Sequence, residues 1–305
     1  MPQAVPHTDI RTDGWVARLP ESVQPYVLLA RLDRPVGTWL LLLPGVWGIE
    51  LAAGRSQEQR WELILLFAIG SLVMRSAGCV VNDIWDRDID AQVARTAGRP
   101  LASGRVSLGN ALVLLAGLLL IGACVLLTLP FLCWWLAPLA LVLVALYPAA
   151  KRVTWWPQLV MGFTFGFGAP MGYAAAGEKI DLPCLLLYAG TILWQLGFDT
   201  IYGFQDMDDD ARIGVRSTSR LWAQQARGFI ACCYLFATAF FFLAAFIARL
   251  NWAFWPVAFV ATLMLGRQIV SLRTDRPALC LKLFKSNVPY AMMLALAFAL
   301  GRYWA

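Results

Sequence analysis

Long apolar stretches alternate with short polar segments along almost the whole chain. We interpret each stretch as a helix, because about 20 apolar residues, rising 1.5 Å each, cross roughly 30 Å of hydrocarbon. Nine stretches approach this length: 36–52, 61–81, 109–129, 131–149, 156–176, 183–203, 228–248, 252–270 and 287–304. The pattern predicts an all-α polytopic membrane protein with about nine transmembrane helices. We expect a single transmembrane domain, 36–305, after an N-terminal segment, 1–35.

The composition favours a membrane protein over a soluble one. Of the 305 residues, 60% are hydrophobic and 14% are charged, whereas about 25% are charged in soluble domains. The only histidine, His7, lies in a polar tail, which excludes His-ligated zinc sites and Ser-His-Asp triads. The seven cysteines form no C-x-x-C pair and are typical of small buried hydrophobic residues.

Lysine and arginine are distributed unequally between the two ends of the apolar stretches. With the N-terminus inside, the cytoplasmic segments carry nineteen and the opposite face carries five, while Arg75 lies within a stretch. This bias predicts a cytoplasmic N-terminus. It also accounts for the net charge of +6 without a nucleic-acid partner, and no obligate protein partner is evident.

The first 25 residues bear on the expected compartment. They contain Asp9, Asp13 and Glu21 and lack a continuous apolar core. Neither a secretory signal nor an acidic-poor transit peptide is therefore indicated. We expect a multi-pass protein of a bacterial inner membrane.

Nine of the nineteen acidic residues fall in two short segments at the expected cytoplasmic face. In the first, Asp83, Asp86 and Asp90 are spaced i, i+3 and i+7, which places them on one face of a helix, whereas Asp88 points elsewhere. Such clustering beside hydrocarbon is costly unless a cation is bound.

The second segment has the same character. Asp206 and Asp210 are i, i+4 neighbours, Asp199 lies two turns earlier on the same face, and Tyr202 is close to it. Carboxylates without His or Cys suit Mg²⁺. The alternative is a set of solvated loop charges with arginine partners, but two such clusters on one membrane face favour the metal.

The two segments also match each other. Asn82, Asp86 and Asp90 have the same spacings as Tyr202, Asp206 and Asp210. This indicates a weak internal duplication that relates 82–90 to 202–210.

Several motifs resemble those of the UbiA-type intramembrane aromatic prenyltransferases. The first aspartate motif of that family is similar to Asn82-Asp83-x-x-Asp86-x-x-x-Asp90, the second to Asp206-x-x-x-Asp210, and the Y-x-x-x-K element to Tyr147-Pro-Ala-Ala-Lys151-Arg152. Similarity to the 4-hydroxybenzoate polyprenyltransferase branch extends to 32–37, 74–81, 95–101, 199–202 and 213–218. Arg216 stands where that branch is expected to carry lysine, and it keeps the charge.

This resemblance implies a nine-helix bundle around a central cavity open to lipid, capped by cytoplasmic loops that carry the aspartate motifs. The implied reaction moves a polyprenyl group from polyprenyl diphosphate to 4-hydroxybenzoate, ortho to the hydroxyl, in ubiquinone biosynthesis. The cofactor implied is Mg²⁺, and the active site would lie near the cytoplasmic face, among membrane lipids.

Roles for individual acidic residues follow from that chemistry. A departing diphosphate binds to Mg²⁺ rather than to carboxylates directly. We expect Asp86 and Asp90 to hold one Mg²⁺ and Asp206 and Asp210 another. Asn82 and Asp83 would be supporting ligands or orienters. Asp199 would take the ring proton or polarise the phenol.

Cationic side chains are candidates for binding the substrates. Lys151 and Arg152, expected in a two-residue turn, would bind the diphosphate or simply belong to the positive-inside bias. Arg95, Arg99 and Arg212 are weaker candidates for the same role.

Arg75 lies about 16 Å deeper than Asp86, at 1.5 Å per residue, where a charge is expensive. It would pair with the benzoate carboxylate, an acidic neighbour or helix-end carbonyls, and Arg34 is a comparable candidate.

Three further alternatives remain open. Gly162, Gly166, Gly168 and Gly172 have spacings typical of close helix packing, but they would also make room for an isoprenoid tail.

In other branches of the family, the acceptor would be a naphthoate, homogentisate, haem or a chlorophyll precursor instead of 4-hydroxybenzoate. An ion-coupled transporter is a rival of another class, although its carboxylates are expected near mid-membrane.

Overall fold

All the regular secondary structure in the part of the chain that the computed structural model describes is helical. These residues are 14–92, 96–205, 207 and 216–303, with 89, 147–149, 151 and 152 described by their backbone alone. The elements are η1 (Val16–Arg18), α1 (Gln24–Leu29), α2 (Val36–Leu51), α3 (Gln57–Trp85), α4 (Arg87–Asp90), α5 (Leu108–Thr128), α6 (Phe131–Val153), α7 (Pro157–Gly166), α8 (Gly168–Gly177), α9 (Leu182–Gly203), α11 (Thr218–Leu221), η2 (Ala223–Gln225), α12 (Ala226–Ile247), α13 (Phe254–Ser271), α14 (Pro277–Lys285) and α15 (Asn287–Tyr303). The predicted all-α class is confirmed.

The predicted apolar stretches coincide with helices. Seven described segments are long and apolar enough to cross a membrane: Gln57–Trp85, Leu108–Thr128, Pro157–Gly177, Leu182–Gly203, Ala223–Ile247, Phe254–Ser271 and Pro277–Tyr303. The two remaining stretches correspond to the shorter apolar helices Val36–Leu51 and Phe131–Leu146. The protein is therefore a multi-pass membrane protein, but the predicted count of nine spans is not confirmed.

The chain divides into two compact units. The first consists of 1–38 and 68–128, and the second of 39–67 and 129–305. Helices α2 and α3 each contribute residues to both units. The expected division into a segment 1–35 and a domain 36–305 differs from this partition and stays a prediction.

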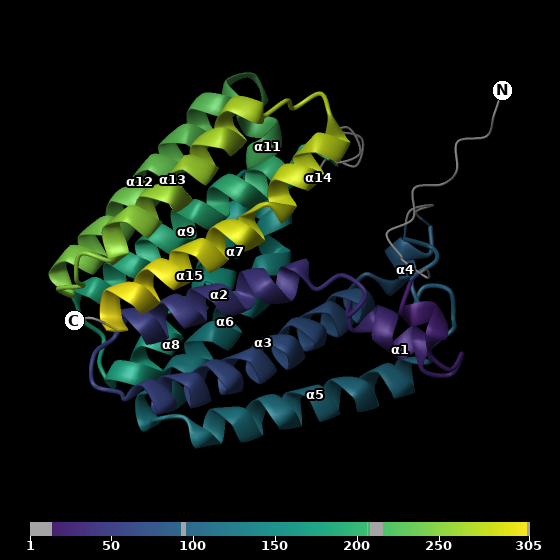
Figure 1. Cartoon of the computed structure of the whole chain (residues 1–305). Helices are drawn as coiled ribbons and strands as arrows, with labels where there is room; N and C mark the ends of the chain where they lie inside the picture. The colour runs from purple at the N-terminus through teal and green to yellow at the C-terminus, as the bar shows by residue number, and fades with distance from the viewer. Residues whose placement is uncertain (1–13, 93–95, 206, 208–215, 304–305) are drawn as a thin grey trace. The chain divides into compact units, whose positions relative to one another are not determined.

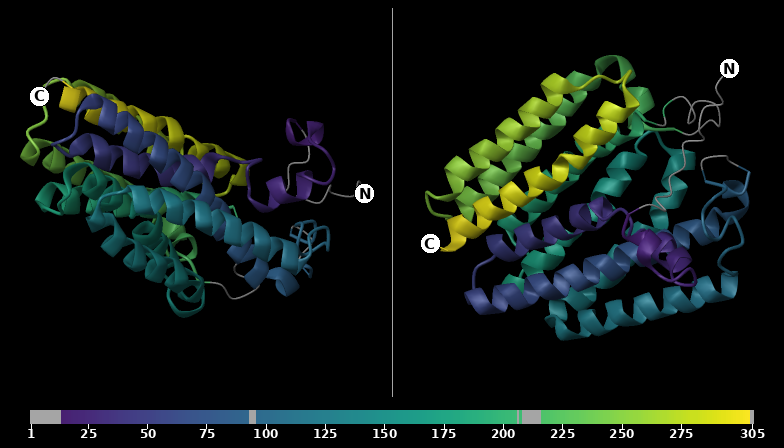
Figure 2. Two further views of the ribbon diagram at one scale, coloured as in Figure 1. Left: turned by 90° about the horizontal axis from the view of Figure 1, so that it is seen from below. Right: turned by 45° about the vertical axis from the view of Figure 1, so that its right-hand side comes forward.

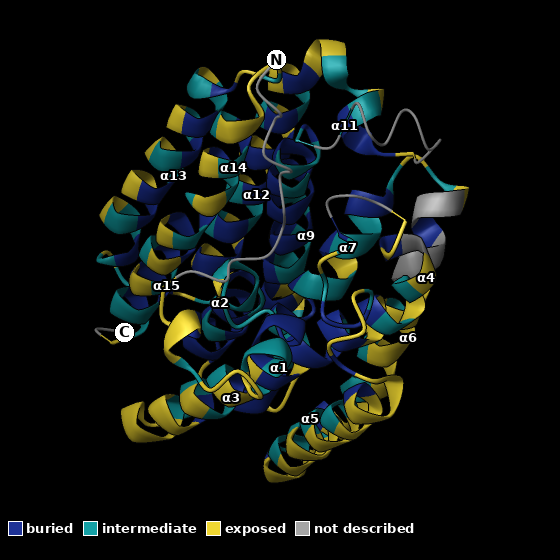
Figure 3. Cartoon of the chain, turned by 90° about the vertical axis from the view of Figure 1, so that its right-hand side faces the viewer, coloured by how far each residue is buried: buried dark blue, intermediate teal, exposed yellow. Residues whose placement is uncertain are grey.

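In the first unit, the later part of α3 runs beside α5 (Figure 1). Gly70 faces Val125 across this contact, and Gly122 faces Met74. The outer side of α5 is exposed along its length (Figure 3) and carries large apolar residues such as Val113, 74% exposed. An exposed apolar helix face is what lipid contact requires.

Helices α1 and α4 lie at the same end of α3 (Figure 1). A small apolar cluster joins Leu29 of α1 to Val80 of α3 and to Leu101, Val106 and Ala111. This cluster fixes the connection between α4 and α5 against the end of α3.

In the second unit, α9 is the central helix. It packs against α7, α8, α12 and α14, while α13 packs against α12 and α15, an arrangement that Figure 2 shows from two sides. The interior includes polar contacts: the Trp194 indole donates to Asn287 Oδ1 at 2.9 Å, and the Tyr234 hydroxyl donates to Gln268 Oε1 at 2.9 Å. Buried hydrogen bonds of this kind hold helices together where apolar packing alone is not selective.

Helices α2 and α8 cross at unusually short range because glycines meet there. A Cβ built on Gly172 would lie 2.1 Å from the Gly45 carbonyl oxygen, and one built on Gly48 would lie 2.2 Å from that of Ala169. Close packing is therefore the role of Gly168 and Gly172. The stretch predicted over 156–176 corresponds to one apolar segment, Pro157–Gly177. Its helix is interrupted at Phe167, between α7 and α8, one turn before Pro170, which has no N–H for a helical hydrogen bond.

Candidate active site

The first aspartate motif occupies the end of α3 and the following α4. The helical hydrogen bonds continue through the junction, from Asp86 N to Asn82 O at 2.9 Å and from Asp90 N to Asp86 O at 2.8 Å. Asn82, Asp86 and Asp90 therefore lie at successive turns of one helical face. Asp88 points away from it, because its side chain is 84% exposed and pairs with Arg87 at 3.1 Å.

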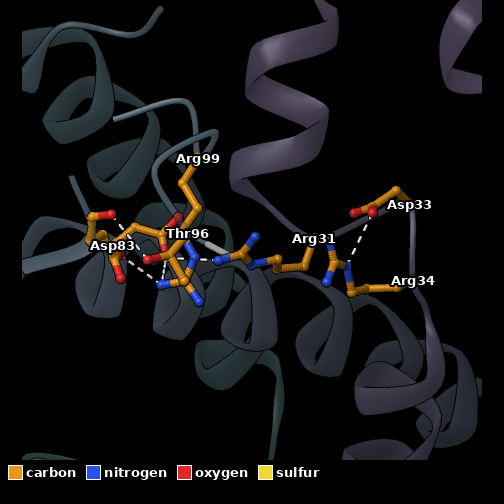
Figure 4. A network of polar contacts seen from close by, with 7 residues as sticks. Arg31, Asp33, Arg34, Asp83, Thr96 and Arg99 are labelled. Atoms are coloured by element: carbon orange, nitrogen blue, oxygen red, sulfur yellow. Dashed lines mark hydrogen bonds and ion pairs between the residues drawn. The ribbon is translucent and has the colours of Figure 1, made fainter. Parts of the chain in front are cut away.

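Asp83 is the most buried acid of the motif and is held by two arginines. Arg31 Nη2 donates to Asp83 Oδ1 at 2.8 Å, and Arg99 Nη1 donates to the same oxygen at 3.4 Å (Figure 4). The side chain of Asp83 is 1% exposed. Ion pairing with two guanidinium groups is thus the role of Asp83 that this geometry supports.

Arg99 also joins Asp83 to Asp90. Its Nη1 lies 2.7 Å from Asp90 Oδ2, and the Thr96 hydroxyl donates to the Asp90 carbonyl oxygen at 3.0 Å. The loop after α4 is thereby bound to the motif through both a side chain and a backbone contact. Sequence reasoning overlooked Arg31 and ranked Arg99 low, because both are single members of a large group of cytoplasmic arginines.

Arg34 and Arg75, the two arginines expected to meet the benzoate carboxylate, both lie in the first unit. Arg34 Nε donates to Asp33 Oδ2 at 3.0 Å (Figure 4). Arg75 lies against the start of α2, because a Cβ built on Gly37 would be 2.6 Å from its Nε. The absence of a side chain at position 37 therefore makes the space that the Arg75 guanidinium occupies.

Asp199 and Tyr202 lie on the last turns of α9, both half-buried. The Tyr202 ring packs on Phe284 of α14, with ring centroids 4.6 Å apart. Asp206 and Asp210 lie outside the described residues, so the predicted pairing of the two aspartate motifs is not tested.

The described residues that follow 215 contact α9. The Thr218 hydroxyl lies 2.7 Å from that of Thr200, and the Thr218 N–H donates to Gln158 Oε1 at 2.9 Å. Ser219 adds a hydrogen bond of 2.8 Å to the Thr200 carbonyl oxygen. Helix α11 is therefore anchored next to Asp199.

The expected turn at Lys151 and Arg152 is wrong. Helix α6 continues to Val153 and ends with a hydrogen bond from Thr154 N to Ala150 O at 2.9 Å. Both cations and Tyr147 thus belong to the last turns of a helix, while their side chains lie outside what is described. The following Pro157 begins α7, and this proline is the signal that marks the actual break.

The described residues contain no group of three or more His, Cys, Asp or Glu side chains gathered as a metal site. The donor chemistry nevertheless fits a hard cation. Asn82 is exposed and Asp86 is half-buried, while Asp83 Oδ2 is buried without a hydrogen-bond partner.

Comparison with known proteins shows relatives over most of the chain. Residues 41–298 match the model of the UbiA prenyltransferase family. The chain is 39% identical to the mitochondrial 4-hydroxybenzoate polyprenyltransferase of Bos taurus, over 92% of this chain and 76% of that protein. It is 37% identical to the mitochondrial 4-hydroxybenzoate polyprenyltransferase of Homo sapiens, over 93% of this chain and 77% of that protein.

Solved structures share the fold. A UbiA homologue from Aeropyrum pernix K1 in its apo form superimposes with a TM-score of 0.72 at 26% identity, covering 86% of this chain and 96% of that one. A UbiA homologue from Archaeoglobus fulgidus bound to GPP and Mg²⁺ gives a TM-score of 0.66 at 18% identity, covering 91% and 98%. The match over 41–298 and the extent of these similarities lead to one conclusion: the chain belongs to the UbiA prenyltransferase family.

Proposed function

We propose that this protein transfers a polyprenyl group from polyprenyl diphosphate to 4-hydroxybenzoate, ortho to the hydroxyl, in ubiquinone biosynthesis. Relatives at 37% and 39% identity that carry the name 4-hydroxybenzoate polyprenyltransferase support the substrate pair. The observation that carries the proposal is the face formed by Asn82, Asp86 and Asp90 at the end of an apolar helix.

The proposed cofactor is Mg²⁺, with oxygen ligands from Asn82, Asp86 and Asp90 and, from the second motif, Asp206 and Asp210. When bound, Mg²⁺ neutralises the charge that develops on the departing diphosphate. The Archaeoglobus fulgidus structure with GPP and Mg²⁺ is too distant to carry the metal over to this chain. The metal is therefore proposed on the oxygen donors of this chain itself.

In the proposed reaction, the bond between C1 of the prenyl chain and the diphosphate oxygen breaks, and C1 bonds to the ring carbon beside the hydroxyl. The diphosphate keeps the electron pair of the broken bond, and the ring carbon loses its proton to a base. We assign to Asp199 the role of the base that takes this proton, or of the group that polarises the phenol. Tyr202 would contact the substrate beside it. A surrounding apolar bundle keeps water from the allylic cation.

Cationic groups of this chain are proposed to hold the two substrates. Lys151 and Arg152, with Tyr147, would contact the diphosphate from the end of α6. Arg75 or Arg34 would bind the benzoate carboxylate, because guanidinium groups form paired hydrogen bonds with carboxylates.

We infer a cytoplasmic N-terminus, with the active site near that face, from the excess of lysine and arginine in the segments on its side. Such a bias sets orientation in membranes. The relatives are named as mitochondrial proteins, and these names do not support the expected bacterial inner membrane. The proposed location is accordingly a membrane crossed several times.

The test is transfer of a labelled polyprenyl diphosphate to 4-hydroxybenzoate by membranes containing the protein, with and without EDTA. Chelation should abolish product, and added Mg²⁺ should restore it. Asp86→Ala and Asp206→Ala should each abolish product while the protein remains in the membrane. Asp88→Ala is the matched control, because this exposed acid points away from the motif face.

Two outcomes would contradict the proposal. Undiminished turnover after chelation would remove the metal-assisted reaction. A panel of other aromatic or tetrapyrrole acceptors identifies the substrate, and preference for one of them over 4-hydroxybenzoate would place the chain in another branch of the family.

A further inference from the structure

A backbone feature singles out Arg31 at the end of α1. Leu32 N bonds to Val27 O at 3.1 Å and Arg31 N bonds to Leu28 O at 3.1 Å, which is the hydrogen-bond pattern of a Schellman C-cap. Arg31 has a φ of +57° there, a conformation for which glycine is the usual residue. The chain carries an arginine at this strained position, and its side chain reaches Asp83.

The contacts of Arg31 continue into a buried group of four charges. Arg31 and Arg99 both donate to Asp83, and Arg99 also donates to Asp90. Their side chains are 11%, 13%, 1% and 9% exposed in the order Arg31, Arg99, Asp83, Asp90. Two positive and two negative charges balance, which is the condition under which ionised groups remain buried.

We infer that Arg99 is a positioning residue for the carboxylate of Asp90, and that Asp83 is the counter-ion of Arg31 and Arg99 rather than a metal ligand. The inference rests on the proposed function, in which Asp90 binds the metal. The first aspartate motif then has two parts. Asn82, Asp86 and Asp90 form a metal-binding face, and Asp83 is a buried counter-ion of the two arginines.

The geometry gives the reason for this division. Asp83 Oδ1 accepts from two guanidinium groups, and Oδ2 is buried without a hydrogen-bond partner. A metal ion at either oxygen would lie close to both cations, which repel it, on a side chain that is only 1% exposed. The Asp90 side chain is more exposed, at 9%, and Arg99 contacts its Oδ2 at 2.7 Å. A hydrogen bond to one carboxylate oxygen orients the group, as the partners of ligating carboxylates do in metal sites.

The test measures metal binding directly. Mn²⁺ is titrated into the purified full-length protein in detergent, with an unreactive prenyl thiodiphosphate present at saturation, and free Mn²⁺ is followed by electron paramagnetic resonance. Arg99→Gln should weaken Mn²⁺ binding by about tenfold to a hundredfold, the usual loss when a partner of a metal ligand is removed. Arg99→Lys should recover part of the loss, because the lysine ammonium group keeps the positive charge but lacks the planar arrangement of donors of the guanidinium group.

Asp83 and Asp90 are then compared with each other. Asp90→Asn should abolish measurable Mn²⁺ binding, whereas Asp83→Asn should lower the melting temperature and weaken binding far less. Arg87→Gln is the control, because this arginine forms its ion pair with the exposed carboxylate of Asp88, away from the motif face. Melting temperatures of all variants are measured so that binding is compared only where the protein is folded.

The outcomes are separable. If Asp83→Asn loses Mn²⁺ as completely as Asp90→Asn, Asp83 is a ligand and the inference is overturned. If Arg99→Gln binds Mn²⁺ as tightly as the unaltered protein, Arg99 has no positioning role. If the unaltered protein binds no Mn²⁺, the metal in the proposed function fails with it, and prenyl transfer in the presence of EDTA shows that failure independently.

Discussion

Arg31 donates a 2.8 Å hydrogen bond to Asp83, a residue 52 positions later in the chain whose side chain is 1% exposed. The contact joins the end of α1 to the end of α3 and so holds the N-terminal segment of the first unit to the aspartate motif. Because both side chains are charged and nearly buried, each charge is stabilised mainly by the other side chain and not by water.

We expect Arg31→Gln and Asp83→Asn each to destabilise the protein strongly. Asp83→Asn removes the carboxylate that compensates the buried Arg31 charge, at a cost of about 3–5 kcal/mol. Arg31→Gln should cost less, because Asp83 keeps its contact with Arg99. The double variant should be less destabilised than the sum of the two, with a coupling of about 0.5–3 kcal/mol. Thermal unfolding in detergent measures all four proteins, and strictly additive effects would show that the contact contributes nothing.

The backbone at Arg31 allows a second, independent measurement. Its φ of +57° is left-handed, and an L-residue there is strained by about 1–2 kcal/mol. Arg31→Gly and Arg31→Ala both remove the contact with Asp83, but only glycine relieves the strain. We therefore expect the glycine variant to melt several degrees above the alanine variant, and equal melting temperatures would argue against backbone strain at this cap.

Local apolar character was enough to predict the helices, because crossing length and hydropathy are properties of a single segment. The interruption at Phe167 also has a local signal, because Pro170 follows one turn later and has no N–H to donate to the Gly166 carbonyl oxygen. The end of α6 was misplaced because Lys151 and Arg152 look like a loop when charge alone is considered, although Pro157 marks the real boundary.

The candidate site was predictable only in part. The spacing of Asn82, Asp86 and Asp90 specifies their common face, because helical geometry is fixed. The different role of Asp83 depends on Arg31, which is distant in sequence, and on Arg99, which is reached only after the chain turns back at α4. No local pattern encodes such contacts.

The crossing of α2 and α8 gives a prediction about stability. Gly172→Ala should be severely destabilising, because the new Cβ would lie 2.1 Å from the Gly45 carbonyl oxygen, and backbone cannot move aside cheaply. Gly266→Ala in α13 is the matched control, since the added methyl group would have nothing within 4 Å of it. That change should be neutral or stabilising by up to about 1 kcal/mol. Comparable melting temperatures for the two variants would exclude close packing as the role of Gly172.

Arg75 and Gly37 give a prediction about recognition of the aromatic substrate. If Arg75 binds the benzoate carboxylate, Arg75→Leu should raise the KM for 4-hydroxybenzoate about tenfold to a hundredfold, which corresponds to the loss of one charge-assisted hydrogen bond. The KM for the prenyl diphosphate should change little. Gly37→Ala should produce a smaller rise of the same kind, because its Cβ would lie 2.6 Å from Arg75 Nε and displace the side chain without removing its charge. Gly78→Ala, on the same helix as Arg75 with nothing within 4 Å of the added methyl, should leave both KM values unchanged. Steady-state kinetics with each substrate varied in turn measures these effects. Equal changes in both KM values for Arg75→Leu would assign Arg75 to the general structure of the site, and the carboxylate would then have to be bound by Arg34.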